Sequence, residues 1–317
     1  MTAGLSPDDR PSVLAAAEQA LGLRLEPLTG GYSGETFGVD LGAGEQAVLR
    51  VCARDPSRAA VLAGVHRLVA GLLPVPRVLD VRLHPPEPMP PFLLFERLPG
   101  LRLDTVLADA DAETSTRLGT AVADVAVLLA GIPFPVGGWL HGLELRVEPF
   151  AGDFGLTTTT EQVLASAFGA TLASPHRDSL RRVALEAEDL IGSSGRACLV
   201  HSDLNPKNVL VDPVSCRVTG LVDWEYTHAG SPLTDAGNLL RFPDHPDFVA
   251  AFTARFFDAA PALPVDPLRV ARALDLLSLF DLALRDQATP NPITRRAAAL
   301  VAETARTGTL AASRPDP

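Results

Sequence analysis

The segment HSDLNPKNVLVD, residues 201–212, gathers side chains suited to proton transfer and metal binding around one short apolar run. A second apolar run, VTGLVD, follows and ends on Asp223. The two runs are typical of a β-hairpin that turns at Asp212. Antiparallel strands bring the residue that enters the first strand close to the residue that leaves the second, so we expect Asp203, Asn208 and Asp223 to converge.

Three oxygen-bearing side chains around one small volume suit phosphoryl transfer. Asn208 and Asp223 offer the hard oxygen ligands that Mg²⁺ accepts, and Mg²⁺ takes its other ligands from water and nucleotide phosphates. Asp203, on the preceding loop, is placed to accept a proton from an attacking hydroxyl. Each residue alone could be a turn, cap or strand-end residue, and only the joint spacing favours chemistry.

The elements that must position this hairpin fall into a β-rich beginning and a helical remainder. A short helix closed by Gly22 precedes β-like stretches at 25–41 and 45–54, a helix at 57–72, and strands at 75–83 and 91–98. Beyond residue 100 the apolar spacing predicts helices over 111–131, 159–173, 176–192, 245–258, 265–286 and 292–307, interrupted by the single hairpin. This order predicts two lobes with a cleft between them.

Composition narrows the classes of protein. The 317 residues are 47% hydrophobic and 21% charged, the balance of a folded globular protein. No apolar run is long enough to span a bilayer and the first residues lack a secretory pattern, so we expect a cytoplasmic protein. Three cysteines without C-x-x-C spacing indicate neither a disulfide framework nor a zinc site. A net charge of −11 without a basic run argues against nucleic acid or membrane partners and permits a cationic ligand.

The motif order resembles the aminoglycoside phosphotransferase and choline kinase branch of the protein-kinase-like fold. H-S-D-L-N-P-K-N followed by V-D-W-E is similar to the family pattern H-x-D-x-x-x-x-N with a later aspartate. The glycine-rich TGGYSGET, the stretches LLPVPRVLD and FLLFERLPG, and SPLTDAGNLLR extend the resemblance over most of the chain. It implies an α+β fold with a small β-rich nucleotide-binding lobe, 1–98, and a larger mainly helical catalytic and acceptor-binding lobe, 99–317.

The resemblance also implies roles in the catalytic loop. Asp203 is expected to be the catalytic base, and His201 to brace the loop by hydrogen bonding. Asn208 and Asp223 are expected to hold Mg²⁺. Asp235, within SPLTDAGN, is expected to anchor the loop through backbone hydrogen bonds.

Further roles implied by the resemblance concern the donor, which is expected to be ATP. Ser33 and Gly34 belong to the glycine-rich turn over the phosphates, and Glu96 to Leu98 form the hinge beside the adenine. Arg50 stands where the family carries a phosphate-gripping lysine, and it keeps the positive charge. The following helix, within SRAAVLAGVHRLVAG, contains no glutamate to orient Arg50, and the sequence alone names no other partner.

The acceptor is expected to be a small hydroxylated and cationic molecule. We expect two acidic residues to bind it. They are Glu225, two residues after Asp223, and Asp281, within the apolar LDLLSLFDLAL. The leading hypothesis is an antibiotic-inactivating O-phosphotransferase that confers resistance and acts on an aminoglycoside or a basic cyclic peptide. Alternatives are a kinase of a small metabolite or macrolide, a non-catalytic pseudokinase-like binding protein, and a metal-dependent hydrolase. The acceptor, the modified hydroxyl and the oligomeric state stay open.

Overall fold

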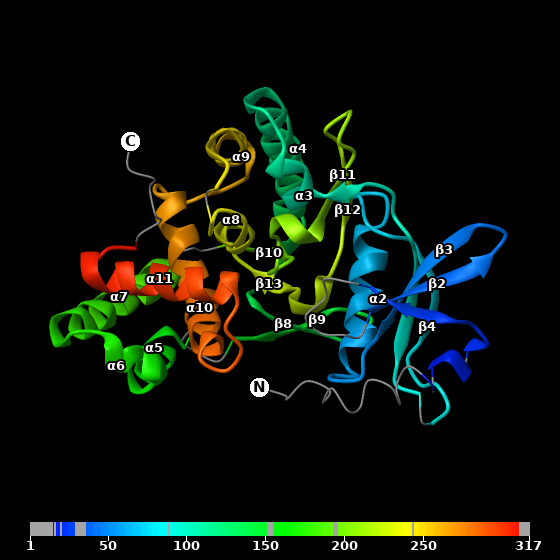
Figure 1. Cartoon of the computed structure of the whole chain (residues 1–317), viewed down its shortest axis with the longest axis horizontal. Coiled ribbons are helices and arrows are strands. Elements are labelled where there is room, and N and C mark those ends of the chain that lie inside the picture. Colours follow the sequence, from blue (N-terminus) through cyan, green and yellow to red (C-terminus); the bar gives the residue numbers. More distant parts are fainter. Residues whose placement is uncertain are drawn as a thin grey trace. The chain divides into compact units, whose positions relative to one another are not determined.

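The computed structural model describes residues 15, 17–19, 21–28, 36–87, 89–150, 155–192, 196–242 and 244–310 (Figure 1). Two predicted phosphate contacts, Ser33 and Gly34, lie outside these ranges. The chain divides into two compact units, each built from several stretches of sequence. The first combines Met1–Leu103, Leu140–Glu148 and Asn208–Glu225, and the second combines Asp104–Trp139, Pro149–Lys207 and Tyr226–Pro317. The first unit thus contains the predicted lobe 1–98 together with two later segments, and the lobe boundary at residue 98 stays a prediction.

An antiparallel sheet forms the centre of the first unit. Its order is β1-β2-β3-β5-β4, with strands β1 (Leu25–Pro27), β2 (Thr36–Gly42), β3 (Glu45–Val51), β4 (Val78–Arg82) and β5 (Phe92–Glu96). Side chains alternate along β3, so Ala47, Leu49 and Val51 enter the core while Arg50 lies on the opposite face. The turn between β2 and β3 includes Gly42 and Gly44, both with positive φ.

Helix α2 (Arg58–Val69) packs in the same unit and is buried along most of its length. Gly64 permits a close approach, because a Cβ at this position would lie 2.6 Å from the carbonyl oxygen of Leu143. Arg67 on the same helix donates a hydrogen bond to that carbonyl at 2.8 Å. These contacts explain why the segment around Leu143 belongs to the first unit.

The predicted hairpin is present in the first unit. Strands β11 (Val209–Val211) and β12 (Val218–Leu221) pair antiparallel, with Val209 opposite Leu221, and β6 (Leu101–Arg102) adds a third strand beside β11. Asp212 forms the turn, because its carboxylate accepts from the peptide N–H groups of Val214 and Ser215.

The second unit is mainly helical, and its long helices agree with the amphipathic spacing. They are α4 (Ala112–Ala130), α5 (Leu156–Ala165), α7 (Ser174–Gly192), α9 (Pro246–Ala259), α10 (Pro267–Asp286) and α11 (Pro292–Thr307), and the short α6 (Ala167–Thr171) follows α5. Helices α4 and α9 lie side by side, and α5, α7, α10 and α11 share one apolar core (Figure 1). The single helix predicted over 159–173 is instead two, because Ser166 is extended and caps α6 with its hydroxyl.

The prediction of one hairpin among the helices was incomplete. A five-stranded sheet with the order β7-β10-β13-β8-β9 is also present, formed by β7 (Pro133–Phe134), β8 (Gly138–His141), β9 (Arg146–Pro149), β10 (Ala197–Val200) and β13 (His228–Gly230). Strands of two to four residues are too short to show an alternating pattern, and their partners lie far away in the sequence. The short helices α3 (Leu103–Ala108) and α8 (Leu233–Leu239) were missed for the same reason of length.

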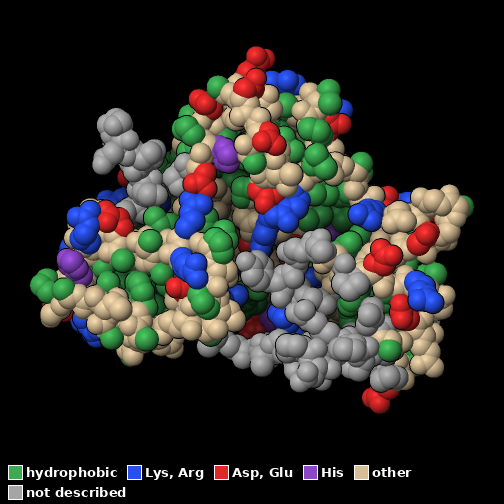
Figure 2. All heavy atoms as spheres, viewed as in Figure 1, with side chains coloured by type: hydrophobic (Ala, Val, Ile, Leu, Met, Phe, Trp, Pro, Cys, Tyr) green, Lys and Arg blue, Asp and Glu red, His purple; other side chains and the backbone are tan. Residues whose placement is uncertain are grey.

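No helix in the described part of the chain is long and apolar enough to cross a membrane. Acidic and basic side chains are interspersed over the face that Figure 2 displays. Cys52, Cys198 and Cys216 are buried, and none of these three forms a disulfide. Burial raises the pKa of Cys198 to about 12, so this thiol stays protonated at neutral pH.

Candidate active site

The loop after β10 is held by a buried carboxylate in the second unit. Asp235, in the first turn of α8, accepts hydrogen bonds from the peptide N–H groups of His201 at 3.0 Å and Ser202 at 2.8 Å. Burial raises the pKa of Asp235 to about 7, while the two peptide donors oppose the shift. The predicted anchoring role of Asp235 through backbone hydrogen bonds is confirmed.

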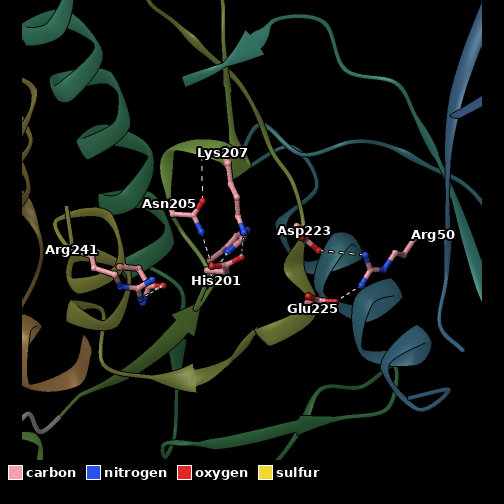
Figure 3. Close-up of polar contacts among 9 residues, drawn as sticks. Arg50, His201, Asn205, Lys207, Asp223, Glu225 and Arg241 are labelled. Atoms are coloured by element: carbon pink, nitrogen blue, oxygen red, sulfur yellow. Dashed lines mark hydrogen bonds and ion pairs between the residues drawn. The ribbon is translucent and has the colours of Figure 1, made fainter. Parts of the chain in front are cut away.

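Asp203 is held from three sides by residues of its own loop. Asn205 Nδ2 donates to Asp203 Oδ1 at 2.6 Å, and Lys207 Nζ lies 3.6 Å from Asp203 Oδ2. The peptide N–H of Asp203 donates to Nδ1 of the fully buried His201 at 3.3 Å, which leaves Nε2 to carry the ring proton in the neutral form. Figure 3 shows the side chains of Asn205 and Lys207 extending toward the region around His201. A partly exposed carboxylate with fixed oxygens is suited to accept a proton from a bound hydroxyl.

Unusual backbone conformations occur directly before Asp203 and at Asp223. Ser202, directly before Asp203, has φ +66°, and Asp223 also has φ +66°, a region that few residues other than glycine adopt. Such conformations cost energy and persist where the surrounding contacts enforce them, often at functional sites. Both candidate aspartates are thus set by unusual backbone geometry.

Asn208 and Asp223 are brought together at one end of the hairpin in the first unit. The peptide N–H of Val222 donates to the carbonyl oxygen of Asn208 at 3.0 Å, in line with the register of β11 and β12. Asn208 is buried and Asp223 is partly exposed. Their amide and carboxylate oxygens are the donor set that Mg²⁺ accepts, so these residues fit the ion. Asp203 belongs to the second unit, and its meeting with this pair stays a prediction.

Arg50 on β3 is enclosed by oxygen atoms of the first unit. Its Nη1 donates to Thr36 Oγ1 at 2.9 Å and lies 3.5 Å from Asp223 Oδ1, and its Nη2 donates to Glu225 Oε2. Figure 3 shows Arg50 pointing toward Asp223 and Glu225. The acidic partners that the sequence did not name for Arg50 are therefore Asp223 and Glu225, which follow β12.

The remaining predicted residues have contacts of their own. Glu96, at the end of β5, accepts from the peptide N–H of Arg77 at 3.0 Å, and the side chain of Leu98 fills the space over Gly220. Asp281 forms an ion pair with Arg285 at 2.7 Å on the half-exposed surface of α10. The roles proposed for these residues in binding nucleotide and acceptor stay predictions.

Two further polar contacts were not foreseen. Asn205 lies two residues after Asp203, and its place inside the motif is a signal that sequence inspection can use. The second is the buried ion pair between Arg241 and Asp275, joined at 2.6 Å. The carboxylate of Asp275 is buried, and the guanidinium of Arg241 compensates its charge.

Comparison with known proteins places this geometry in a family. The model of the phosphotransferase enzyme family matches residues 24–268, and the chain therefore belongs to that family. The class of enzyme expected from the motif, a small-molecule phosphotransferase, is the class that this family defines. The predicted family resemblance is confirmed.

Curated relatives match only segments of the chain. Acyl-CoA dehydrogenase family member 11 of Mus musculus is 33% identical over 112 residues, which are 33% of this chain and 14% of that protein. Aminoglycoside 3'-phosphotransferase of Streptomyces fradiae is 35% identical over 95 residues, 29% of this chain and 33% of that protein. The matches thus span a third or less of these relatives' length.

Solved structures match nearly the whole chain. A thermostable mutant of aminoglycoside phosphotransferase APH(4)-Ia, in a ternary complex with ADP and hygromycin B, has a TM-score of 0.63 at 20% identity, covering 94% of this chain and 97% of that one. The GDP complex of wild-type aminoglycoside 2'-phosphotransferase-IIIa has a TM-score of 0.62 at 15% identity, covering 94% and 97%. The kinase-like α+β fold expected from the sequence is confirmed.

Proposed function

We propose that the protein is an ATP- and Mg²⁺-dependent O-phosphotransferase that acts on a small, hydroxylated, cationic molecule. The observation that carries this proposal is the fixed carboxylate of Asp203, with Asn205 at one oxygen and Lys207 near the other. The anchoring of the loop by Asp235 supports it, because a proton acceptor must be held in place to act.

In the proposed reaction, Asp203 accepts the proton of the acceptor hydroxyl. The hydroxyl oxygen forms a bond to the γ-phosphorus of ATP as the bond between that phosphorus and the bridging oxygen breaks, and ADP leaves. Asn205 and Lys207 keep the two oxygens of Asp203 in position, and His201 holds its peptide N–H. The protein's part is mainly positioning and charge compensation.

The metal would be held by Asn208 and Asp223, and when bound it would neutralise phosphate charge. Arg50 would contact the phosphates beside it, as expected for the family's β3 cation. Ser33, Gly34, Glu96 and Leu98 complete the proposed nucleotide contacts. The nucleotides in the APH(4)-Ia and 2'-phosphotransferase-IIIa complexes, ADP and GDP, support a purine nucleotide as donor without choosing between the bases.

A cationic acceptor is supported by the net charge of −11. The hygromycin B complex of the APH(4)-Ia mutant and the aminoglycoside relative from Streptomyces fradiae support an aminoglycoside as the first class to test. Resistance by inactivation would follow if an antibiotic proves to be the acceptor. Basic cyclic peptides, macrolides and small metabolites belong in the same screen, and we propose that the enzyme acts in the cytoplasm.

The test is an acceptor screen with purified protein, ATP and Mg²⁺. Aminoglycosides, basic peptide antibiotics, macrolides and choline are incubated separately and analysed by mass spectrometry for gain of one phosphoryl group. The proposal expects a modified acceptor, formed only when both ATP and Mg²⁺ are present. Tight uptake of an acceptor that is returned unchanged under every donor condition would contradict it and favour the non-catalytic binding protein.

A further inference from the structure

Arg50 carries a nearly buried positive charge whose compensation comes from an unexpected place. Its side chain is 11% exposed, and a guanidinium so far removed from water needs opposite charge or hydrogen-bond acceptors around it. Helix α2, described over its whole length, contributes none of the charge, because RAAVLAGVHRLV contains no acidic residue. The acidic partners are Asp223 and Glu225, more than 170 residues later in the chain.

The two edges of the guanidinium are used differently. Nη2 is taken by Glu225 Oε2 in a direct hydrogen bond, whereas Nη1 donates to Thr36 and makes only the longer 3.5 Å contact with Asp223. A planar guanidinium accommodates such a division, because its donors point in fixed directions. Glu225 therefore sets the orientation of Arg50 and holds its charge beside Asp223 rather than directly on it.

We infer that Glu225 is a positioning residue for Arg50 and takes the place of the missing helix glutamate. Glu225 thereby couples Arg50 to the loop that carries Asp223. This rests on the proposed function, because it assumes that Arg50 meets nucleotide phosphates and Asp223 meets Mg²⁺. It assigns Glu225 to the donor side of the reaction instead of the acceptor side. Helix α2 is therefore not needed to orient Arg50.

The charges around Arg50 also affect metal binding at Asp223. With Glu225 present, one cation is shared between two carboxylates, and Asp223 retains negative charge for a metal ion. Without the charge of Glu225, the guanidinium is free to turn to Asp223, where a direct ion pair would compete with Mg²⁺ for the same oxygens. Loss of Glu225 should therefore weaken nucleotide binding and raise the Mg²⁺ concentration that this binding requires.

The experiment measures binding of the non-hydrolysable analogue AMP-PNP by calorimetry to the full chain, at several Mg²⁺ concentrations. The variants are Glu225→Gln, Arg50→Met and the double variant, with Glu161→Gln as matched control. Glu161 pairs with Arg181 through two hydrogen bonds on the exposed surface of the second unit. Thermal unfolding of each variant without nucleotide checks the fold, and Thr36→Val replaces Arg50→Met if that variant does not fold.

We expect Glu225→Gln to raise the Kd of AMP-PNP about tenfold, as for loss of one charge-assisted hydrogen bond. The Mg²⁺ concentration for half-maximal binding should also rise, and the double variant should bind no more weakly than Arg50→Met. Glu161→Gln should bind as the wild type does. An unchanged Kd in Glu225→Gln beside a weakened Arg50→Met would overturn the inference, as would a rise in acceptor KM alone. Wild-type protein that binds no nucleotide would instead contradict the proposed function itself.

Discussion

Lys207 Nζ lies 3.6 Å from Oδ2 of Asp203, four residues earlier on the same loop. Asn205 occupies the other oxygen of that carboxylate at 2.6 Å. The only lysine of the chain therefore belongs to the candidate catalytic loop, with 31% of its side chain exposed. Asp203 is held at both oxygens, which restricts the directions from which it can accept a proton.

Replacing Lys207 should reduce turnover more than stability. Lys207→Met removes the contact at Oδ2, so the carboxylate of Asp203 samples other rotamers, and kcat should fall about tenfold or more. The melting temperature should stay close to that of the wild type, because a partly exposed ion pair adds little stability. Steady-state kinetics with the acceptor found in the screen provides the measurement. Lys207→Arg, which keeps the charge, should retain more activity than Lys207→Met, and equal losses in the two variants would contradict the proposed positioning.

Asp235 should make the protein more stable in mild acid than at neutral pH. Burial raises its pKa from 3.8 to about 7 in the folded state, so the folded protein binds this proton more tightly than the unfolded chain does. The resulting stabilisation is complete below pH 3.8 and is lost as the pH rises through about 7, with a span of about 4 kcal/mol. Denaturant unfolding of wild type and Asp235→Asn, measured at several values between about pH 4.5 and 7.5, should show this pH-dependent difference.

Asp235→Asn should also lower stability throughout. The amide keeps one acceptor oxygen but turns its NH₂ group toward one of the two buried peptide donors, which costs about 1–3 kcal/mol. A difference between wild type and variant that does not vary with pH would show that the carboxyl titrates normally in the folded protein.

His66 should have the opposite pH dependence. Burial lowers its pKa from 6.5 to about 4, and its Nδ1 lies 2.8 Å from the carbonyl oxygen of Leu62. Its stabilising contribution is present above pH 6.5 and is lost as the pH falls through about 4, with a span of about 3 kcal/mol. His66→Phe keeps a ring against Phe95, 4.6 Å away in the wild type, and removes the titration.

The measurement for His66 is the free energy of unfolding from pH 7 down to about 4, compared with the exposed His84→Gln as control. Asp235 and His66 act in opposite directions over the same pH range, so their contributions to the stability of the wild type should largely cancel. His66→Phe should become relatively more stable as the pH falls. Parallel curves for His66→Phe and wild type would mean that His66 is not held neutral by burial.

Local patterns predicted the hairpin and most long helices correctly. The strands around Asp212 and the helices α4, α7, α9, α10 and α11 have apolar spacing that repeats within one element, and the contacts of Asp235 follow from the motif order. The loop of Ser33 and Gly34 lies outside the described residues, so that part of the prediction remains as it was.

What the sequence did not predict depends on distant partners. Arg50 and Glu225 are 175 residues apart, and the sequence around either residue does not indicate the other as its partner. The pairing of β7, β10 and β13 likewise joins short strands from separate regions. Residue types at these positions are compatible with several partners, and only the tertiary fold selects one.

The most direct test of the central claim is single-turnover phosphoryl transfer by Asp203→Asn. Asparagine keeps the size of the side chain and one acceptor oxygen but cannot take up the hydroxyl proton as the carboxylate does. The rate with the identified acceptor should fall by about 10² or more, while the Kd of AMP-PNP stays within about twofold of the wild type. A rate equal to that of the wild type would contradict the assignment of Asp203 as the base.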